Sequence, residues 1–261
     1  MAEPHIRKMT ASEAIPQPRP AIAVLPLGAT EQHGPHLPLE TDAIIAEGVA
    51  ARAKASIGDS LGVEFLPAEP VGYSVEHLDF AGTRSLAFDE AVNRWISIGE
   101  DCHRRGLRKF VMLNAHGGNA PLMTIVATEL RARLGMLAVA TSWTRFGYPA
   151  HLVSPQERAL GIHGGFIETS VMLALRPDLV DMARARDFPS RQADFEAEFV
   201  HLRAYGPHAF GWKAGDLSPE GVVGDAAAAT AEAGEEILAH AATGFVELLE
   251  DVARFDVTSL A

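Results

Sequence analysis

The chain has 261 residues, of which 48% are hydrophobic and 21% are charged, a composition typical of globular proteins rather than disordered or fibrous ones. The net charge of −12 repels phosphate backbones and anionic lipid surfaces, which argues against nucleic-acid and membrane partners. The sequence has one cysteine, Cys102, so an intramolecular disulfide is excluded. Residues 1–20 lack the apolar segment of a signal peptide, and no apolar run approaches the ~20 residues of a membrane span. We therefore expect one cytoplasmic domain over residues 1–261.

Strand and helix patterns alternate along the chain. Short apolar runs predict strands over residues 21–27, 63–67, 109–113 and 136–141. Apolar residues at helical spacing predict helices over residues 43–55, 88–105, 121–134, 168–175 and 225–255. Thr41 and Asp42 stand where the N-cap of the first helix belongs. This alternation predicts an α/β layer structure with a mainly parallel sheet and helices on both faces.

Five side chains with the chemistry of metal ligands occur in the loops and helix starts that follow the predicted strands. They are Glu31, His33, Asp42, His116 and Glu168. The carboxyl ends of parallel strands meet at one edge of a sheet, so we expect these side chains to lie close together. Nitrogen and carboxylate ligands without thiolates suit zinc, manganese or ferrous iron. Three carboxylates and two histidines suffice for two divalent ions bridged by one acid, holding a bridging hydroxide that can attack a carbonyl.

Each of these residues also has an ordinary structural interpretation. Asp42 could cap a helix, and Glu168 could complement a helix dipole. His116 could be a turn residue whose neighbouring glycines cradle a phosphate. Each interpretation explains its own residue, but together they give no reason for five such residues to gather at one sheet edge. For His36, His77 and His163, a supporting position, a substrate contact and a surface position all stay open.

Other catalytic patterns are absent from the sequence. It contains no G-x-S-x-G, G-x-G-x-x-G, Walker or H-E-x-x-H motif. Cys102 lies on an apolar helical stripe and is expected to be a buried structural thiol.

Two long motifs identify a family resemblance. GATEQHGPHLPLETD over residues 28–42 and NAHGGN over residues 114–119 resemble the creatininase (creatinine amidohydrolase) family. Three later blocks, over residues 72–83, 163–170 and 216–225, occur in the family's order. The resemblance implies a three-layer αβα fold, a binuclear metal centre and hydrolysis of a carbon–nitrogen amide bond, usually in a homo-oligomer that is often hexameric.

The resemblance also implies a role for each matching residue. Glu31, Asp42 and His116 would bind one ion; His33, Asp42 and a further carboxylate would bind the other, with Asp42 bridging. In creatininases that carboxylate lies two residues after the loop histidine, where this chain has Gly118, so Glu168 is the candidate to replace it. His163 would protonate the leaving nitrogen or stabilise the tetrahedral intermediate. The candidates for substrate contact are Ser74, His77, Gly117 and Gly118.

The substrate pocket departs from that of true creatininases. Their tryptophan and aspartate before the active-site histidine are missing here, where Leu160, Gly161 and Ile162 precede His163. Gly117 also replaces a tyrosine, which argues against creatinine as the substrate. Relatives with the HGGN loop include a formamide hydrolase of flavin and deazaflavin biosynthesis and the peptidase of mycofactocin maturation.

The sequence therefore predicts a metal-dependent amidohydrolase acting on a non-peptide C–N bond of a small cyclic amide or formamide. The expected cofactors are two divalent ions, zinc first, with manganese or iron as alternatives. A peptidase or deformylase of cofactor biosynthesis, or a non-catalytic metabolite-binding homologue, are the competing hypotheses. For the segment over residues 178–212, a lid and a subunit contact both stay open.

Overall fold

The computed structural model describes residues 21–58 and 61–260, so the expectation of no signal peptide in residues 1–20 lies outside the described residues. The central sheet has four parallel strands in the order β2-β1-β3-β4. The strands are β1 (Ile22–Leu27), β2 (Val63–Phe65), β3 (Lys109–Asn114) and β4 (Leu137–Ser142). Leu27 pairs with Asn114, which pairs with Ser142, so three strands end level. The loops after β1 and β3 consequently begin side by side.

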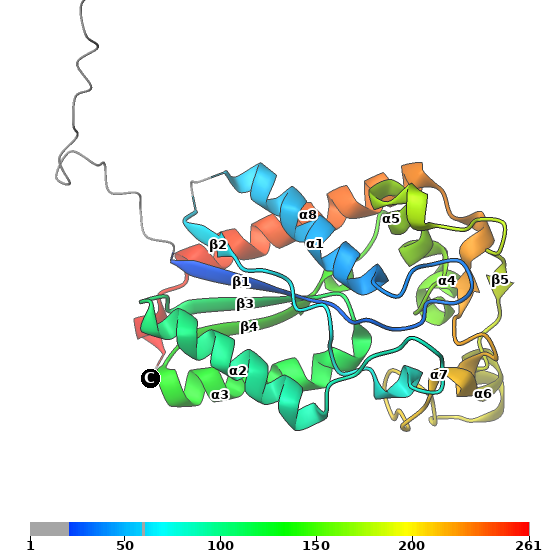
Figure 1. Ribbon diagram of the computed structural model, residues 1–261, viewed down its shortest axis with the longest axis horizontal. Helices are drawn as coiled ribbons and strands as arrows, with labels where there is room; N and C mark the ends of the chain where they lie inside the picture. The colour runs from blue at the N-terminus through cyan, green and yellow to red at the C-terminus, as the bar shows by residue number, and fades with distance from the viewer. Residues whose placement is uncertain (1–20, 59–60, 261) are drawn as a thin grey trace, which may run out of the picture.

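Helices cover both faces of the sheet, as Figure 1 shows. One face packs against α1 (Thr41–Ile57), α5 (Phe166–Leu175) and α8 (Ala231–Arg254); the other packs against α2 (Phe88–Arg104) and α3 (Ala120–Leu134). Successive strand residues alternate between the two cores, Ile22 and Val24 in the first, Ala23 and Leu25 in the second. The predicted three-layer αβα architecture with a parallel sheet is confirmed.

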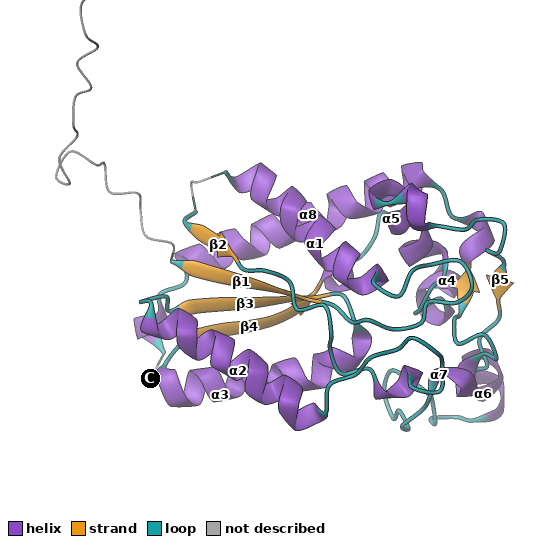
Figure 2. Ribbon diagram, viewed as in Figure 1, coloured by secondary structure: helices purple, strands orange, loops and turns teal. Residues whose placement is uncertain are grey.

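The shorter elements lie beyond the carboxyl ends of the strands (Figure 2). They are α4 (Pro155–Leu160), α6 (Gln192–Glu198), α7 (Ala214–Leu217) and the antiparallel pair β5 (Asp187–Phe188) and β6 (Gly224–Asp225). Single 3-10 turns occur at Val75–His77, Gly117–Asn119, Trp143–Phe146, Pro177–Leu179, Ala226–Ala228 and Val257–Ser259. None of the described helices is both long and apolar enough to cross a bilayer.

Several regions differ from the sequence prediction, among them the short helices α4 and α7, which were not predicted. The last helix begins at Ala231 rather than at 225, because Asp225 pairs in β6 and Thr230 caps the helix by accepting from the Ala233 N–H at 3.1 Å. Within residues 178–212 the structure has β5 and α6, which were not predicted. Part of this segment packs through Phe195 and Trp212 against a small apolar cluster.

Candidate metal centre

Glycine and asparagine contacts hold the loops around the site together. Gly28 follows β1 against the start of α1, and a Cβ atom there would lie 2.6 Å from the Ala43 backbone, so no side chain fits. Asn119 donates to the Gly28 carbonyl at 3.0 Å and accepts from the Tyr73 N–H at 2.9 Å. One amide side chain therefore joins the loops that follow β1, β2 and β3.

Four of the predicted ligands meet beyond the ends of β1 and β3. His33 Nε2 lies 3.3 Å from Asp42 Oδ1. His116 Nδ1 lies 3.1 Å from Glu31 Oε1 and 3.5 Å from Asp42 Oδ2. All four residues are buried, with at most 4% of their surface exposed. Asp42 thus lies between two imidazoles, each facing a different carboxylate oxygen, which is the position that a bridging ligand requires.

Glu168 reaches the same cluster from the first turn of α5. Its Oε2 atom lies 3.8 Å from His33 Nε2 and accepts a hydrogen bond of 2.6 Å from the Gly164 N–H. Two sets of potential ligand atoms each lie within 4.8 Å of one another: Glu31 with Asp42 and His116, and His33 with Asp42 and Glu168. A third set combines Glu31, His33 and His163. The fold thus brings together all five residues selected from the sequence.

Three buried atoms of this cluster have no hydrogen-bond partner among the described residues: Glu31 Oε1, His33 Nε2 and Asp42 Oδ2. An unpaired buried polar atom costs roughly 1–3 kcal/mol, so three that converge on one region fit cations lying between them. Carboxylate oxygens and imidazole nitrogens are also a donor set that suits zinc or manganese.

The N-cap position predicted for Thr41 and Asp42 is wrong. The helix α1 already includes both residues, Glu40 occupies the cap position, and no side chain caps the helix. The helix begins two residues before the predicted start at 43, and the Thr41 side chain donates from Oγ1 to the Pro38 carbonyl at 2.7 Å instead of capping it. The Asp42 carboxylate consequently faces the cluster and not the helix N–H groups.

The charges in the cluster stabilise one another. Burial by itself lowers the pKa of His33 and His116, but the neighbouring carboxylates outweigh it and raise the two values to about 9 and about 10. Burial raises the pKa of Glu168 to about 7. Burial also acts to raise the pKa of Glu31, but the surrounding histidines outweigh it and hold that pKa well below its usual range. At pH 7 the two imidazoles therefore carry protons where cations would bind.

Two further histidines and a serine surround Glu31. His163 Nδ1 and His77 Nε2 lie 3.6 Å and 3.5 Å from Glu31 Oε1. Burial lowers the pKa of His77 to about 4 and that of His163 well below its usual range, so both rings are neutral at pH 7. Ser74 Oγ donates a 2.5 Å hydrogen bond to Glu31 Oε2. Ser74 therefore orients Glu31, leaving Oε1 to face the imidazoles.

A cavity of about 370 Å³ adjoins the cluster. Trp143, Tyr148, Arg158 and Ile162 line it together with Glu168. Because Glu168 belongs to both the cavity and the cluster, a small molecule in this cavity would lie beside the predicted ligands. The cavity is within the size range of small-molecule sites.

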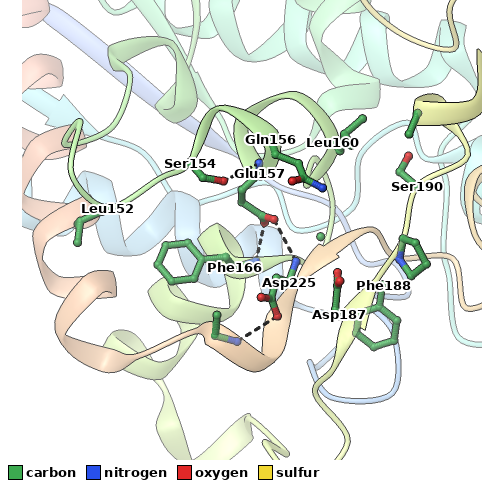
Figure 3. Close-up of a pocket in the computed structure, with 14 residues that line it drawn as sticks. Leu152, Ser154, Gln156, Glu157, Leu160, Phe166, Asp187, Phe188, Ser190 and Asp225 are labelled. Atoms are coloured by element: carbon green, nitrogen blue, oxygen red, sulfur yellow. Dashed lines mark hydrogen bonds between the residues drawn. The ribbon is translucent and has the colours of Figure 1, made fainter. Parts of the chain in front are cut away.

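A separate pocket of about 390 Å³ lies next to α4 and the β5–β6 pair, as Figure 3 shows. Phe166, Phe188 and Asp187 are among its lining residues, and none of the predicted site residues is. Glu157 lies in this pocket with both oxygens occupied: Oε1 accepts from the Phe166 N–H at 2.8 Å, and Oε2 accepts from the Asp225 N–H at 3.0 Å. Its carboxylate joins α4 to α5 and β6.

Sequence comparison decides the family. The model of the creatininase family, described as creatinine amidohydrolase, matches residues 7–249. The chain belongs to the creatininase family. It is 34% identical over 234 residues to the mycofactocin precursor peptide peptidase of Mycobacterium tuberculosis strain H37Rv, covering 87% of this chain and 84% of that protein. It is 31% identical over 184 residues to the creatinine amidohydrolase of Pseudomonas putida, covering 64% of this chain and 69% of the relative.

Solved creatininase structures have the same fold. A manganese creatininase superposes with a TM-score of 0.72 at 27% identity, covering 90% of this chain and 92% of the other. A mutant creatininase of the Zn–Zn type also gives a TM-score of 0.72, at 28% identity and the same coverage.

Gly118 marks the main departure from the creatininase pattern, and the structure gives its physical reason. A Cβ atom at Gly118 would lie 2.5 Å from the Tyr73 carbonyl oxygen and 2.6 Å from Glu76 Oε1. The Glu76 carboxylate occupies the space that a side chain at 118 would need, 3.5 Å from His116 Nε2. Gly117, in contrast, is exposed, and a Cβ atom there would meet open space. This member of the creatininase family thus supplies a carboxylate next to the loop histidine from a different loop.

Gln32 and Glu76 are the site residues that the sequence reasoning missed. Gln32 stands between two predicted ligands, Glu31 and His33, and was not among the residues selected from the sequence. Its side chain contacts His77 and His163, and the chain turns just after His33 at Gly34, with φ of 73°. Glu76 directly precedes His77, and that adjacency was the available signal.

His36 lies behind the cluster. Its Nε2 atom is 2.9 Å from Thr169 Oγ1 and 3.1 Å from the Gly164 carbonyl oxygen. His36 therefore ties the loop after β1 to the turn that leads into α5, which carries Glu168.

Proposed function

We propose that this protein is a binuclear metal-dependent amidohydrolase. Glu31, Asp42 and His116 would hold one divalent ion, and His33, Asp42 and Glu168 the other. The observation that carries the proposal is the convergence of buried ligand atoms without hydrogen-bond partners. When bound, two such ions supply Lewis-acid chemistry: they polarise a carbonyl group and lower the pKa of water. Zinc or manganese suits the donor set, and both metals are named for creatininase neighbours.

The protein's own residues would do the remaining work. His163 lies at the edge of the cluster with its side chain 12% exposed, where it can carry a proton to the leaving nitrogen. Asp42 would hold the two ion positions together, and Ser74 would keep Glu31 in its orientation. Gly117 would leave open space for the substrate, Gly118 would leave space for the Glu76 carboxylate beside it, and His77 and Ser74 would contact the substrate.

The substrate that we propose is a small cyclic amide or a formamide. The cavity beside Glu168 has a volume suited to such a molecule. The tryptophan and aspartate that precede the histidine in creatininases are missing from positions 160–162, and Gly117 stands in place of the tyrosine. A peptidase or deformylase activity is the second candidate, favoured by the 34% identity to a peptide peptidase. A non-catalytic metabolite-binding role is opposed by the presence of all five ligand-type side chains. We expect a cytoplasmic homo-oligomer, with a hexamer as the first expectation.

Elemental analysis of metal content per chain tests this proposal. The protein would be purified without added metal, and measured again after chelation and reloading with zinc or manganese. We expect about two ions per chain, and about one in Glu168→Ala. Glu157→Gln is the matched control, since it changes a carboxylate outside the cluster and should leave the count unchanged. No metal after reloading would overturn the hydrolase and favour the metabolite-binding alternative.

A substrate screen separates the candidates within the hydrolase class. Cyclic amides, formamides and short peptides would be tested with the metal-loaded protein. Turnover of the first two groups alone supports the proposal, whereas cleavage confined to peptides replaces it with the peptidase.

A further inference from the structure

The side-chain amide of Gln32 has one possible orientation. Its Oε1 atom accepts a hydrogen bond of 2.9 Å from the Gly34 N–H, and its Nε2 atom donates one of 2.6 Å to the Gly221 carbonyl. Exchanging the oxygen and the nitrogen would bring two donors together at Gly34 and two acceptors together at Gly221. Two backbone groups therefore fix which end of the amide carries the hydrogens.

This orientation determines where His77 carries its proton. The second N–H of Gln32 Nε2 points to His77 Nδ1 at 2.8 Å, so Nδ1 must accept. A neutral imidazole that accepts at Nδ1 has its hydrogen on Nε2. His77 Nε2 lies 3.5 Å from Glu31 Oε1, so this ring directs an N–H donor toward the cluster.

His163 is held by the backbone of the same residue, and it is turned the opposite way. Its Nε2 atom lies 2.8 Å from the Gln32 carbonyl oxygen, which can only accept, so Nε2 carries the hydrogen. The Gln32 amide nitrogen, at 3.4 Å from the same His163 atom, is also a donor and forms no competing bond. In its neutral form, with that single hydrogen on Nε2, His163 directs the Nδ1 lone pair toward Glu31 Oε1, 3.6 Å away.

The two rings lie next to each other, with centroids 4.3 Å apart. Neither His77 Nε2 nor His163 Nδ1 has a hydrogen-bond partner among the residues that the structure describes. The cluster is thus bordered by one donor and one acceptor, both oriented through Gln32.

We propose that Gln32 is a positioning residue that assigns complementary roles to the two histidines: His77 donates a hydrogen bond to the substrate carbonyl oxygen, and His163 accepts and passes on the proton. The inference rests on the proposed amidohydrolase function. As water attacks the carbonyl carbon, the new C–O bond forms and His163 Nδ1 takes the water proton. The His77 N–H stabilises the negative charge that develops on the carbonyl oxygen. His163 then gives its proton to the nitrogen as the C–N bond breaks, yielding an acid and an amine.

The tautomers can be measured directly, without a substrate. Nitrogen–proton correlation spectra of zinc-loaded protein labelled with ¹⁵N-histidine report which ring nitrogen carries hydrogen. We expect the hydrogen on Nε2 of both His77 and His163. In Gln32→Leu, His77 should become a mixture of tautomers while His163 stays unchanged, because its partner is the main-chain carbonyl of residue 32. Hydrogen on His77 Nδ1 in the native protein would overturn the proposal.

A matched pair of substitutions tests the catalytic role of His77. Asparagine at 77 can place its oxygen near the Nδ1 position and accept from Gln32, but it has no donor that reaches the cluster. Glutamine at 77 can extend a donor to the Nε2 position. We expect His77→Asn to lose about 10²–10³-fold in kcat with unchanged metal content, and His77→Gln to recover at least about tenfold of that loss. The rate is measured with the amide that the screen above hydrolyses fastest.

Equal rates for the two variants, or loss of metal in His77→Asn, would overturn the donor role. If the native protein binds no metal and hydrolyses nothing, the proposed function fails. The tautomer measurement still decides the role of Gln32 in that case.

Discussion

The carboxylate of Glu157 and those of the cluster beyond the sheet have opposite surroundings. Glu157 lies beside the pocket of Figure 3, and each of its oxygens accepts a backbone N–H, from Phe166 and from Asp225. In the cluster beyond β1 and β3, Glu31 and Asp42 are more deeply buried, yet each keeps one oxygen without a hydrogen-bond partner. The fully buried carboxylates are thus the ones whose oxygens the fold leaves without partners, and the half-buried Glu157 is the one that it satisfies.

The difference lies in what surrounds the oxygens. Backbone N–H groups satisfy Glu157 permanently, so its carboxylate joins elements of the fold. The cluster instead surrounds its carboxylates with imidazoles whose protons can be exchanged for a cation. A carboxylate that is satisfied by the fold contributes to stability, and one that is left unsatisfied is available to a ligand.

The largest effect is expected from Asp42. Replacing it with alanine or asparagine removes the carboxylate shared by both predicted ligand sets, so we expect both ions and turnover to be lost, with activity falling more than about 10³-fold. Elemental analysis and a rate measurement on the reloaded variant check this. Circular dichroism establishes that the variant is folded. Full activity in either variant would contradict the shared-ligand role.

Substitution of His163 tests whether this residue is a proton carrier or a metal ligand. Replacing it with alanine should leave the metal content near that of the native protein while lowering kcat/KM by about 10²–10⁴-fold, because a proton carrier is removed and no ligand is lost. The variant is assayed for metal and for rate in parallel. Loss of one ion would instead make His163 a ligand, in line with the set that it forms with Glu31 and His33.

Substitution of Glu157 should lower the stability of the protein and leave its metal content unchanged. Its replacement by alanine leaves the N–H groups of Phe166 and Asp225 without their partner, which we expect to lower the free energy of unfolding by about 2–3 kcal/mol. Glutamine at the same position keeps one acceptor oxygen and should lose about half as much. Denaturant unfolding of both variants measures the difference. A large loss of metal with unchanged stability would erase the contrast between the two carboxylate sites.

The sequence predicted the sheet, the main helices and the five ligand-type residues because these follow from local patterns. Apolar runs report strands, and polar residues directly after parallel strands converge at one edge of the sheet. The positions of Gln32 and Glu76 depend instead on contacts between distant segments. Gln32 meets the Gly221 carbonyl across 189 residues, and nothing local to Gln32 indicates that contact. The missed α4, with Pro155 at its first position, did have a local signal in the Ser-Pro pair at its start.

The smallest expected effect is a pH dependence of stability that differs between metal-free and metal-loaded protein. In the metal-free state the pKa of His33 is raised to about 9 and that of His116 to about 10. Their contribution to stability is fully present below about pH 6.5, the ordinary histidine pKa, and is lost as pH rises through those values. Glu168 changes the pH dependence of stability in the same direction. Its pKa is raised to about 7, so stability is lost as pH rises toward that value and its buried carboxyl group ionises.

Bound cations would replace the protons on these imidazoles, and metal affinity should itself rise with pH over the same range. The Tm difference between loaded and chelated protein should therefore widen between pH 6.5 and pH 9, by on the order of 5 °C. Thermal unfolding with and without chelator at several pH values measures it, and Glu157→Gln should show the same widening because it lies outside the cluster. A gap that narrows with rising pH would mean that the protons on His33 and His116 do not compete with the metal. The contrast between a carboxylate satisfied by the fold and carboxylates kept for a cation would then lose its electrostatic basis.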